Sequence, residues 1–214
     1  MSDDSMTPSE ISQNQDNYES PVLDIGRKLF ELRDYTPIPL IVLVLFFAQP
    51  SVRTATIGTL LAVFGELFRI YSVAFIGSVS RTRNTSTTGS ALITSGPFAW
   101  IRNPLYVGNA LITLGVALFS GQPLIMAITV LLFAFQYHCI VKYEEKLLIE
   151  RFGQEYLDYM QKVPAWVPAR MPSLQEVEWP ETFSPALRSE RRTLAAVAVM
   201  LTALMLIKGG KTSG

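Results

Sequence analysis

Two short stretches of this sequence combine charged and aromatic side chains in a way that could bind a polar ligand. In the first, Arg102 and Asn103 directly precede Pro104, and Tyr106 follows within the next turn. Asparagine followed by proline is typical of a helix start. The free N–H groups of a helix start favour a carboxylate or a phosphate. Arg102 adds a planar guanidinium that can donate two parallel hydrogen bonds, so this stretch is a candidate anion site.

In the second stretch, Glu144 and Glu145 follow Tyr137 and His138, the only histidine of the chain. Residues seven apart on a helix lie on nearly the same face. The spacing therefore predicts that Tyr137 lies near Glu144 and that His138 lies near Glu145. Two carboxylates with a tyrosine and a histidine suit hydrogen-bonding to amino and hydroxyl groups. The alternative is a solvated helix end with ordinary surface charge, and a histidine that only bridges two helices.

A third candidate is the pair Glu66 and Arg69, which lies inside an apolar segment. Because the two residues are three positions apart, they can form an ion pair on one helix face. Small residues allow close helix packing in membranes, and two stripes of them occur here: Gly58, Ala62, Gly65 and Ser72 near that face, then Gly108 and Gly115 further on. We therefore expect the charged pair to face protein. It is either a structural ion pair or a contact for a substrate.

The elements that must position these groups are five apolar segments: Pro37–Gln49, Thr54–Gly77, Pro104–Phe119, Pro123–Val141 and Leu194–Ile207. A bilayer core of about 30 Å needs roughly 17–25 helical residues. The second and fourth segments meet that length alone, and the others need their flanks. Only helices and closed barrels satisfy their backbone in lipid, and no alternating pattern occurs. The sequence predicts an all-α integral membrane protein with about five transmembrane helices, the third and fourth forming a hairpin.

The basic residues indicate an orientation. The 18 Lys and Arg balance the 18 Asp and Glu, so no nucleic-acid partner is expected from net charge. With an inside N-terminus, most basic residues fall on one side: Arg27, Lys28, Arg33, Arg81, Arg83, Arg102, Lys142, Lys146, Arg151, Lys162, Arg170, Arg188, Arg191 and Arg192. The positive-inside rule then predicts that the N-terminus and the loops 78–103 and 142–193 are cytoplasmic.

Composition divides the chain into three parts. Residues 1–20 are acidic and polar, so a disordered tail without a cleaved signal peptide is expected there. Residues 21–193 are expected to form the membrane-embedded domain, with the proline-rich stretch 163–190 as an interfacial cover. Residues 194–214 are expected to form a last transmembrane helix and a tail. One Cys and one His predict neither an internal disulfide nor a metal site.

Taken in order, these motifs resemble the isoprenylcysteine carboxyl methyltransferase and phospholipid methyltransferase superfamily of integral membrane enzymes. The resemblance covers roughly residues 55–168. The segments that carry it are Leu92–Phe98, Ile101–Gly108, Glu144–Leu148, and Phe152 and Gly153 with Tyr156 and Tyr159; Gly65–Arg69 and Ser80–Arg83 resemble the bacterial members. Asn103 stands where the family often has histidine, which removes a titratable group.

The resemblance implies a methyltransferase that uses S-adenosyl-L-methionine at the cytoplasmic edge of a bacterial inner membrane. The implied partners are the lipid bilayer and a lipophilic acceptor, either an isoprenylcysteine-type carboxylate or a lipid amine. The expected cofactor residues are Arg102, Asn103, Pro104, Tyr106, Tyr137, His138, Glu144 and Glu145. The expected catalytic residues, on the acceptor side, are Glu66, Arg69 and Arg81.

Two other classes of function stay open. One is an NADPH-dependent membrane reductase of the steroid-reductase type, but a 2′-phosphate would favour a basic cluster over the Glu144–Glu145 pair. The other is a non-enzymatic membrane protein or a transporter. The chain has no inverted repeat, and its polar groups gather at one membrane edge instead of the midplane.

Overall fold

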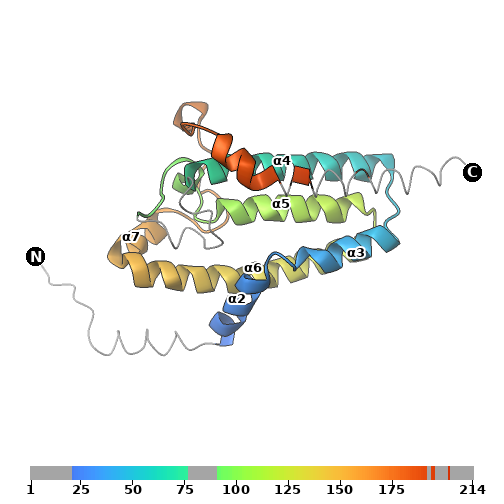
Figure 1. Cartoon of the computed structure of the whole chain (residues 1–214), viewed down its shortest axis with the longest axis horizontal. Coiled ribbons are helices and arrows are strands. Elements are labelled where there is room, and N and C mark those ends of the chain that lie inside the picture. Colours follow the sequence, from blue (N-terminus) through green and yellow to red (C-terminus); the bar gives the residue numbers. More distant parts are fainter. Residues whose placement is uncertain (1–20, 77–90, 192–193, 196–201, 203–214) are drawn as a thin grey trace, which may run out of the picture.

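The protein is built around a row of three long helices. A computed structural model describes residues 21–76, 91–191, 194–195 and 202. In this described part all regular structure is helical, as the apolar pattern predicts. Helices α4 (Val52–Ile76), α5 (Pro104–Phe119) and α6 (Pro123–Phe152) lie side by side with α5 in the middle (Figure 1).

The helix bounds follow the apolar segments closely. Helices α4 and α6 are long and apolar enough to cross a membrane. The apolar helices α3 (Pro37–Phe47) and α5 are shorter. Of the fifth predicted segment the structure describes only 194–195 and 202, which are helical, and the N-terminal tail lies outside the described residues.

Antiparallel α4 and α5 touch backbone to backbone through their two stripes of small residues. A Cβ added at Gly58 would lie 2.5 Å from the Gly115 carbonyl oxygen, and one added at Gly115 would lie 2.6 Å from that of Gly58. At the other end, a Cβ on Gly65 would lie 2.8 Å from the Gly108 oxygen. The prediction that the two stripes are packing faces is therefore confirmed.

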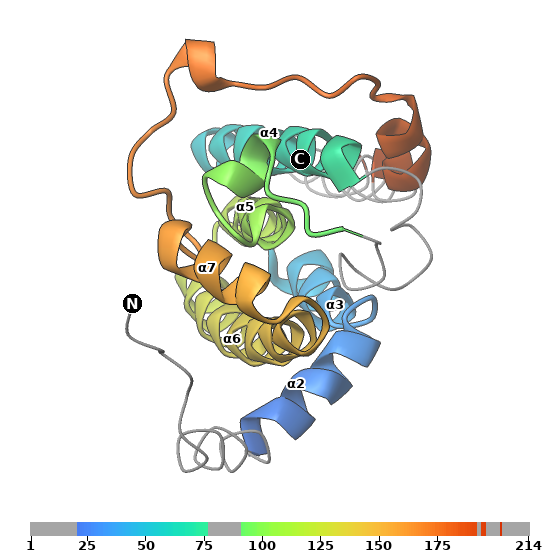
Figure 2. The same cartoon turned by 90° about the vertical axis from the view of Figure 1, so that its left-hand side faces the viewer.

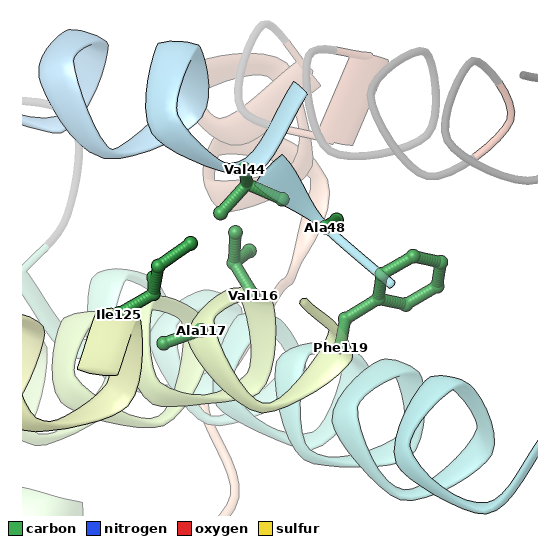
Figure 3. Close-up of a cluster of buried hydrophobic side chains, with 6 residues drawn as sticks. All are labelled: Val44, Ala48, Val116, Ala117, Phe119 and Ile125. Atoms are coloured by element: carbon green, nitrogen blue, oxygen red, sulfur yellow. The ribbon is translucent and has the colours of Figure 1, made fainter. Parts of the chain in front are cut away.

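A tight turn joins α5 to α6. Gly121 adopts a positive φ of 68°, and the Ser120 carbonyl accepts a hydrogen bond from the Gln49 N–H at 2.8 Å. Beside the turn, Val44 and Ala48 from α3 and its end face Val116, Ala117 and Phe119 of α5 and Ile125 of α6 (Figure 3). This apolar cluster closes the hairpin end of the bundle.

Helix α6 continues well past its apolar part. The apolar segment was predicted to end at Val141, and the helix that contains it runs on to Phe152, so Glu144 and Glu145 lie on one helix with Tyr137 and His138 as predicted. Gly153, with φ 54°, then turns the chain into α7 (Gln154–Lys162). About 20 helical residues span the hydrocarbon, so Glu144 and Glu145 lie just beyond that length. Helix α2 (Pro21–Leu32), which was not anticipated, packs on α6 through Gly26.

Residues 163–183 run from α7 over α4 to a helical stretch at 184–191 (Figure 2). Glu178 fastens this crossing segment: its carboxylate accepts the Gly96 N–H at 2.8 Å, and its carbonyl accepts the Tyr71 hydroxyl at 2.7 Å. Tyr159 of α7 donates to the Phe98 carbonyl at 2.6 Å. Because burial raises the pKa of Tyr159, its hydroxyl stays protonated and can make this bond.

Candidate active site

Three hydrogen-bonded contacts follow one another between the start of α5 and the end of α6, and we call them the polar seam. Arg102 donates to Glu145 at 2.7 Å, Tyr106 donates to Glu144 at 2.6 Å, and Asn109 donates to Tyr137 at 3.0 Å. The hairpin makes α5 and α6 antiparallel, so residue numbers rise along α5 while the numbers of their partners on α6 fall. The seam therefore leads from the ends of the helices into the apolar part of the bundle.

The outermost contact is a buried ion pair that also holds neighbouring segments. Besides Glu145, the Arg102 guanidinium donates to the carbonyls of Met160 at 3.0 Å and Val163 at 2.6 Å. The side chains of Arg102 and Glu145 are only 10% and 9% exposed. This pair ties α6 to the end of α7 as well as to the loop that precedes α5.

Helix α5 begins as predicted, with Asn103 in the position before the helix and Pro104 as its first residue. The Asn103 side chain does not cap the helix, however. It donates to the Ala165 carbonyl at 3.1 Å and so holds the crossing segment near the seam. Pro104 is fully buried where α5 begins.

The middle contact leaves a carboxylate oxygen without a partner. Tyr106 and Glu144 are both buried, and Tyr106 bonds only one of the two Glu144 oxygens. The other, Oε1, has no hydrogen-bond partner among the described residues. The Nε of Arg102 is likewise buried without a hydrogen-bond partner in the described part of the chain. Buried polar atoms are normally paired, so these two are candidates for contact with a ligand.

The innermost contact belongs to a longer network. Arg69 of α4 donates to the side-chain oxygen of Asn109, whose NH₂ group donates to the Tyr137 hydroxyl. Arg69 also forms a 2.8 Å ion pair with Glu190 of the 184–191 helix. The C-terminal part of the chain is thus linked to the seam through one guanidinium.

The predicted pairing of Glu66 with Arg69 is confirmed. Glu66 Oε2 lies 3.7 Å from Arg69 Nε, which is within ion-pair range but too long for a hydrogen bond. Glu66 is 3% exposed, and neither of its oxygens has a hydrogen-bond partner in the described segments. The carboxylate is therefore buried beside Arg69 with unused acceptor capacity.

His138 lies apart from this cluster. It is exposed, whereas Tyr137 and Glu145 are buried. The prediction that His138 lies with Glu145 in the polar region is therefore wrong: both are on α6, but only Glu145 is buried, where Arg102 bonds it. The structure brings Tyr106, Tyr137, Glu144, Glu145 and Arg102 together and leaves His138 outside; Arg81 lies outside the described residues.

Three residues at the seam were not singled out from the sequence: Arg33, Asn109 and Glu190. Arg33 follows α2 and is close enough to act electrostatically on Tyr106, Tyr137 and Glu144. Asn109 carried one usable signal, since a polar residue within an apolar span often marks a functional position. Glu190 contacts Arg69 across 121 positions of sequence, a distance that local patterns do not bridge.

An apolar groove lies at the other end of the bundle. It has a volume of about 800 Å³ and is lined by α3, the chain that follows it and the start of α6, with Phe46, Phe47, Leu124 and Ile128 among its residues. Among the described residues that line it, none carries a charged side chain. The groove therefore offers no charged group to a ligand, whereas the polar seam does.

Comparison with known proteins gives one consistent match. Residues 54–155, from α4 to the start of α7, match the phospholipid methyltransferase family. The protein-S-isoprenylcysteine O-methyltransferase of Mus musculus is 36% identical over 118 residues, which are 52% of this chain and 40% of that protein. The protein of the same name from Homo sapiens is 34% identical over 116 residues, with the same two coverages.

A bacterial relative is also similar. The cobalt-zinc-cadmium resistance protein CzcN of Cupriavidus metallidurans is 31% identical over 113 residues, 53% of this chain and 48% of that protein. The chain thus spans less than half the length of each of these relatives. The matched region contains all six side chains of the polar seam.

Proposed function

We propose that this chain, which matches the phospholipid methyltransferase family over residues 54–155, belongs to the phospholipid and isoprenylcysteine methyltransferase superfamily and is an integral membrane methyltransferase. Its methyl donor is S-adenosyl-L-methionine. Its acceptor is lipophilic or amphiphilic, with an isoprenylcysteine-type carboxylate or a lipid amine. The site lies at the cytoplasmic face of a bacterial inner membrane, because the basic residues gather at that end.

The observation that carries this proposal is the free oxygen of Glu144 at the centre of the seam. An acceptor that is buried without a partner is costly, so Glu144 Oε1 suits the amino group or a ribose hydroxyl of the cofactor. The rings of Tyr106 and Tyr137 lie 4.8 Å apart beside it. Aromatic faces attract cations, so they suit a sulfonium. The residues present therefore fit the cofactor.

Arg102 and its neighbours have a second role in this proposal. The terminal nitrogens of Arg102 are engaged by Glu145 and by two carbonyls, and its Nε–H remains for the cofactor carboxylate. Asn103 and Pro104 shape the entrance by holding the crossing segment and starting α5. The exposed position of His138 does not support a cofactor contact.

The chemistry that the cofactor supplies when bound is an electrophilic methyl group. The chain has to place the acceptor in line with that group and to exclude water, and such positioning accounts for large rate effects. No nucleophile from the protein is required. Arg69, which bonds Asn109 at the inner end of the seam, and Glu66 beside it are the proposed acceptor-side residues, together with Arg81 from outside the described part.

The experiment that tests this function is a calorimetric titration of the detergent-purified protein, first with S-adenosyl-L-methionine and then with NADPH. We expect saturable binding of S-adenosyl-L-methionine and none of NADPH. Transfer of a labelled methyl group to N-acetyl-S-farnesylcysteine or to phosphatidylethanolamine then identifies the acceptor class. Binding of NADPH without binding of S-adenosyl-L-methionine would contradict the proposal in favour of a reductase.

A further inference from the structure

The hydrogen bonds around Asn109 have only one possible direction. A guanidinium donates and never accepts, so the group that faces Arg69 must be the Asn109 side-chain oxygen. The NH₂ group of the same amide then faces Tyr137 and donates to its hydroxyl oxygen at 3.0 Å. Arg69 therefore fixes the orientation of the amide, and the amide makes the Tyr137 oxygen an acceptor.

This direction leaves the phenolic hydrogen of Tyr137 without a partner. The hydrogen cannot point at Asn109, because an N–H group already occupies that side. Tyr137 is 8% exposed, and within the described ranges no acceptor is found for its hydrogen. A buried hydroxyl donor that makes no bond is costly, so this donor suits a ligand group at the inner end of the seam.

The direction of this bond indicates which ligand group that is. A phenolic hydrogen needs an acceptor atom, so it favours a carboxylate or phosphate oxygen over an ammonium group, which can only donate. The surroundings are otherwise apolar, with Phe133 stacked on the Tyr137 ring at 4.2 Å, which suits the rest of an amphiphile.

The other end of the network explains why Arg69 faces Asn109. One terminal nitrogen of Arg69 is held by Glu190 at 2.8 Å, and the other bonds Asn109. The helix that carries Glu190 is fixed on α4, since Ala186 packs against Ile70 and Val73. Glu190 thus positions the guanidinium, which in turn orients the amide.

We propose that Tyr137 donates its phenolic hydrogen to an acidic oxygen in the head group of the acceptor, and that Asn109, Arg69 and Glu190 are positioning residues that aim this donor. The inference rests on the proposed methyl transfer: it assigns the Tyr137 hydroxyl to the acceptor and leaves the Tyr137 ring beside the sulfonium. With a carboxylate acceptor, donation to one oxygen leaves a lone pair of the other to form the new O–CH₃ bond. The C–S bond breaks, its electron pair stays on sulfur, and no proton is released.

The test uses two substitutions that remove the same hydrogen bond in different ways. Tyr137→Phe removes the donor. Asn109→Asp retains the acceptor for Arg69 but offers Tyr137 a carboxylate, so the phenolic hydrogen turns away from the ligand. We expect each change to weaken binding of N-acetyl-S-farnesylcysteine about ten- to a hundredfold. The double variant should bind no more weakly than Tyr137→Phe alone, because both changes remove one interaction.

Controls separate this role from a structural one. Tyr143→Phe makes the same chemical change on α6 next to Phe30 of α2, 5.9 Å between ring centroids, and should leave the affinity unchanged. Farnesylamine, which has no acidic oxygen, should bind wild type and Tyr137→Phe alike. Phosphatidic acid in micelles tests whether the oxygen that accepts the Tyr137 hydrogen belongs to a phosphate instead of a carboxylate. The probe whose affinity falls in Tyr137→Phe carries the head group that is recognised.

Calorimetry with S-adenosyl-L-methionine on the same samples distinguishes this inference from the proposed function. Cofactor affinity should be unchanged in all variants. Equal affinity of wild type and Tyr137→Phe for both acidic probes, or no binding of either probe, would overturn the role of Tyr137 whatever the cofactor result. Probe binding that depends on Tyr137 without any cofactor binding would keep this inference and reject the methyltransferase.

Discussion

Helix α5 has two very different neighbours. Against α4 it presents glycines, and the backbones come so close that an added methyl group at Gly115 would meet the Gly58 carbonyl at 2.6 Å. Against α6 it presents Tyr106 and Asn109, which reach across through hydrogen bonds, as does Arg102 from the loop before α5. The glycine interface fixes where α5 lies, and this rigidity lets the opposite side hold polar groups at defined distances. Precise positioning is what methyl transfer requires of a protein.

The Arg102–Glu145 pair gives the strongest test of this contrast between a structural interface and a functional one. The pair belongs to the polar seam, and yet we expect it to stabilise the fold. Arg102→Ala leaves a buried carboxylate and two carbonyls without their donor. Removing one partner of a buried ion pair typically costs about 3–5 kcal/mol. We expect a large fall in the thermal midpoint in detergent, measured by loss of helical signal on heating.

The matched control is Arg170→Ala, which breaks an exposed ion pair with Glu176. Exposed pairs add little, so its midpoint should hardly move. Equal midpoints for Arg102→Ala and Arg170→Ala would show that the outer contact of the seam is not part of the stable framework.

A smaller effect tests the glycine interface, and its sign is the informative part. In an ordinary helix Gly→Ala stabilises by about 0.5–1 kcal/mol. At Gly115 the new methyl would meet the Gly58 carbonyl and the Ala62 backbone nitrogen at 2.6 and 2.7 Å. Overpacking costs about 1–3 kcal/mol, so Gly115→Ala should lower the unfolding midpoint.

Ala134→Val, on the exposed side of α6, serves as the comparison for added volume, and it should leave the midpoint nearly unchanged. A Gly115→Ala protein that is as stable as wild type, or more stable, would mean that α4 and α5 do not pack as closely as described.

The same two interfaces show what local sequence reveals. The glycine stripes follow helical spacing, so both faces and the Glu66–Arg69 pair could be predicted from residues close in sequence. The start of α5 at Pro104 and its end at Phe119 also followed from turn and apolar signals. The spacing could not predict which residues of a helix face are buried by other segments. His138 and Glu145 share a helix face, but only Glu145 is buried.

Contacts between distant segments were also beyond reach of the sequence. The Arg102 guanidinium is held by the end of α7 and the Arg69 guanidinium by Glu190, which are tertiary contacts without a local signature. Arg102 was therefore predicted only as a ligand contact or a positive-inside residue, whereas in the structure it also braces neighbouring segments. Asn109 could have been noticed as a polar group in an apolar helix, but its bond to Tyr137 could not.

The central claim is that the free oxygen of Glu144 in the polar seam binds the methyl donor. Its most direct test is calorimetric titration of Glu144→Gln with S-adenosyl-L-methionine. The new amide retains an acceptor for Tyr106 and replaces the free oxygen by an NH₂ group, so the fold should be kept. Loss of a hydrogen bond to a charged group costs about 1.5–3 kcal/mol, or roughly ten- to a hundredfold in affinity.

Glu150→Gln changes an exposed carboxylate on the same helix and serves as the matched control. The account predicts that Glu144→Gln binds S-adenosyl-L-methionine ten- to a hundredfold more weakly than wild type, and that Glu150→Gln binds it as wild type does. Wild-type affinity in a folded Glu144→Gln protein would contradict the account and place the methyl donor elsewhere.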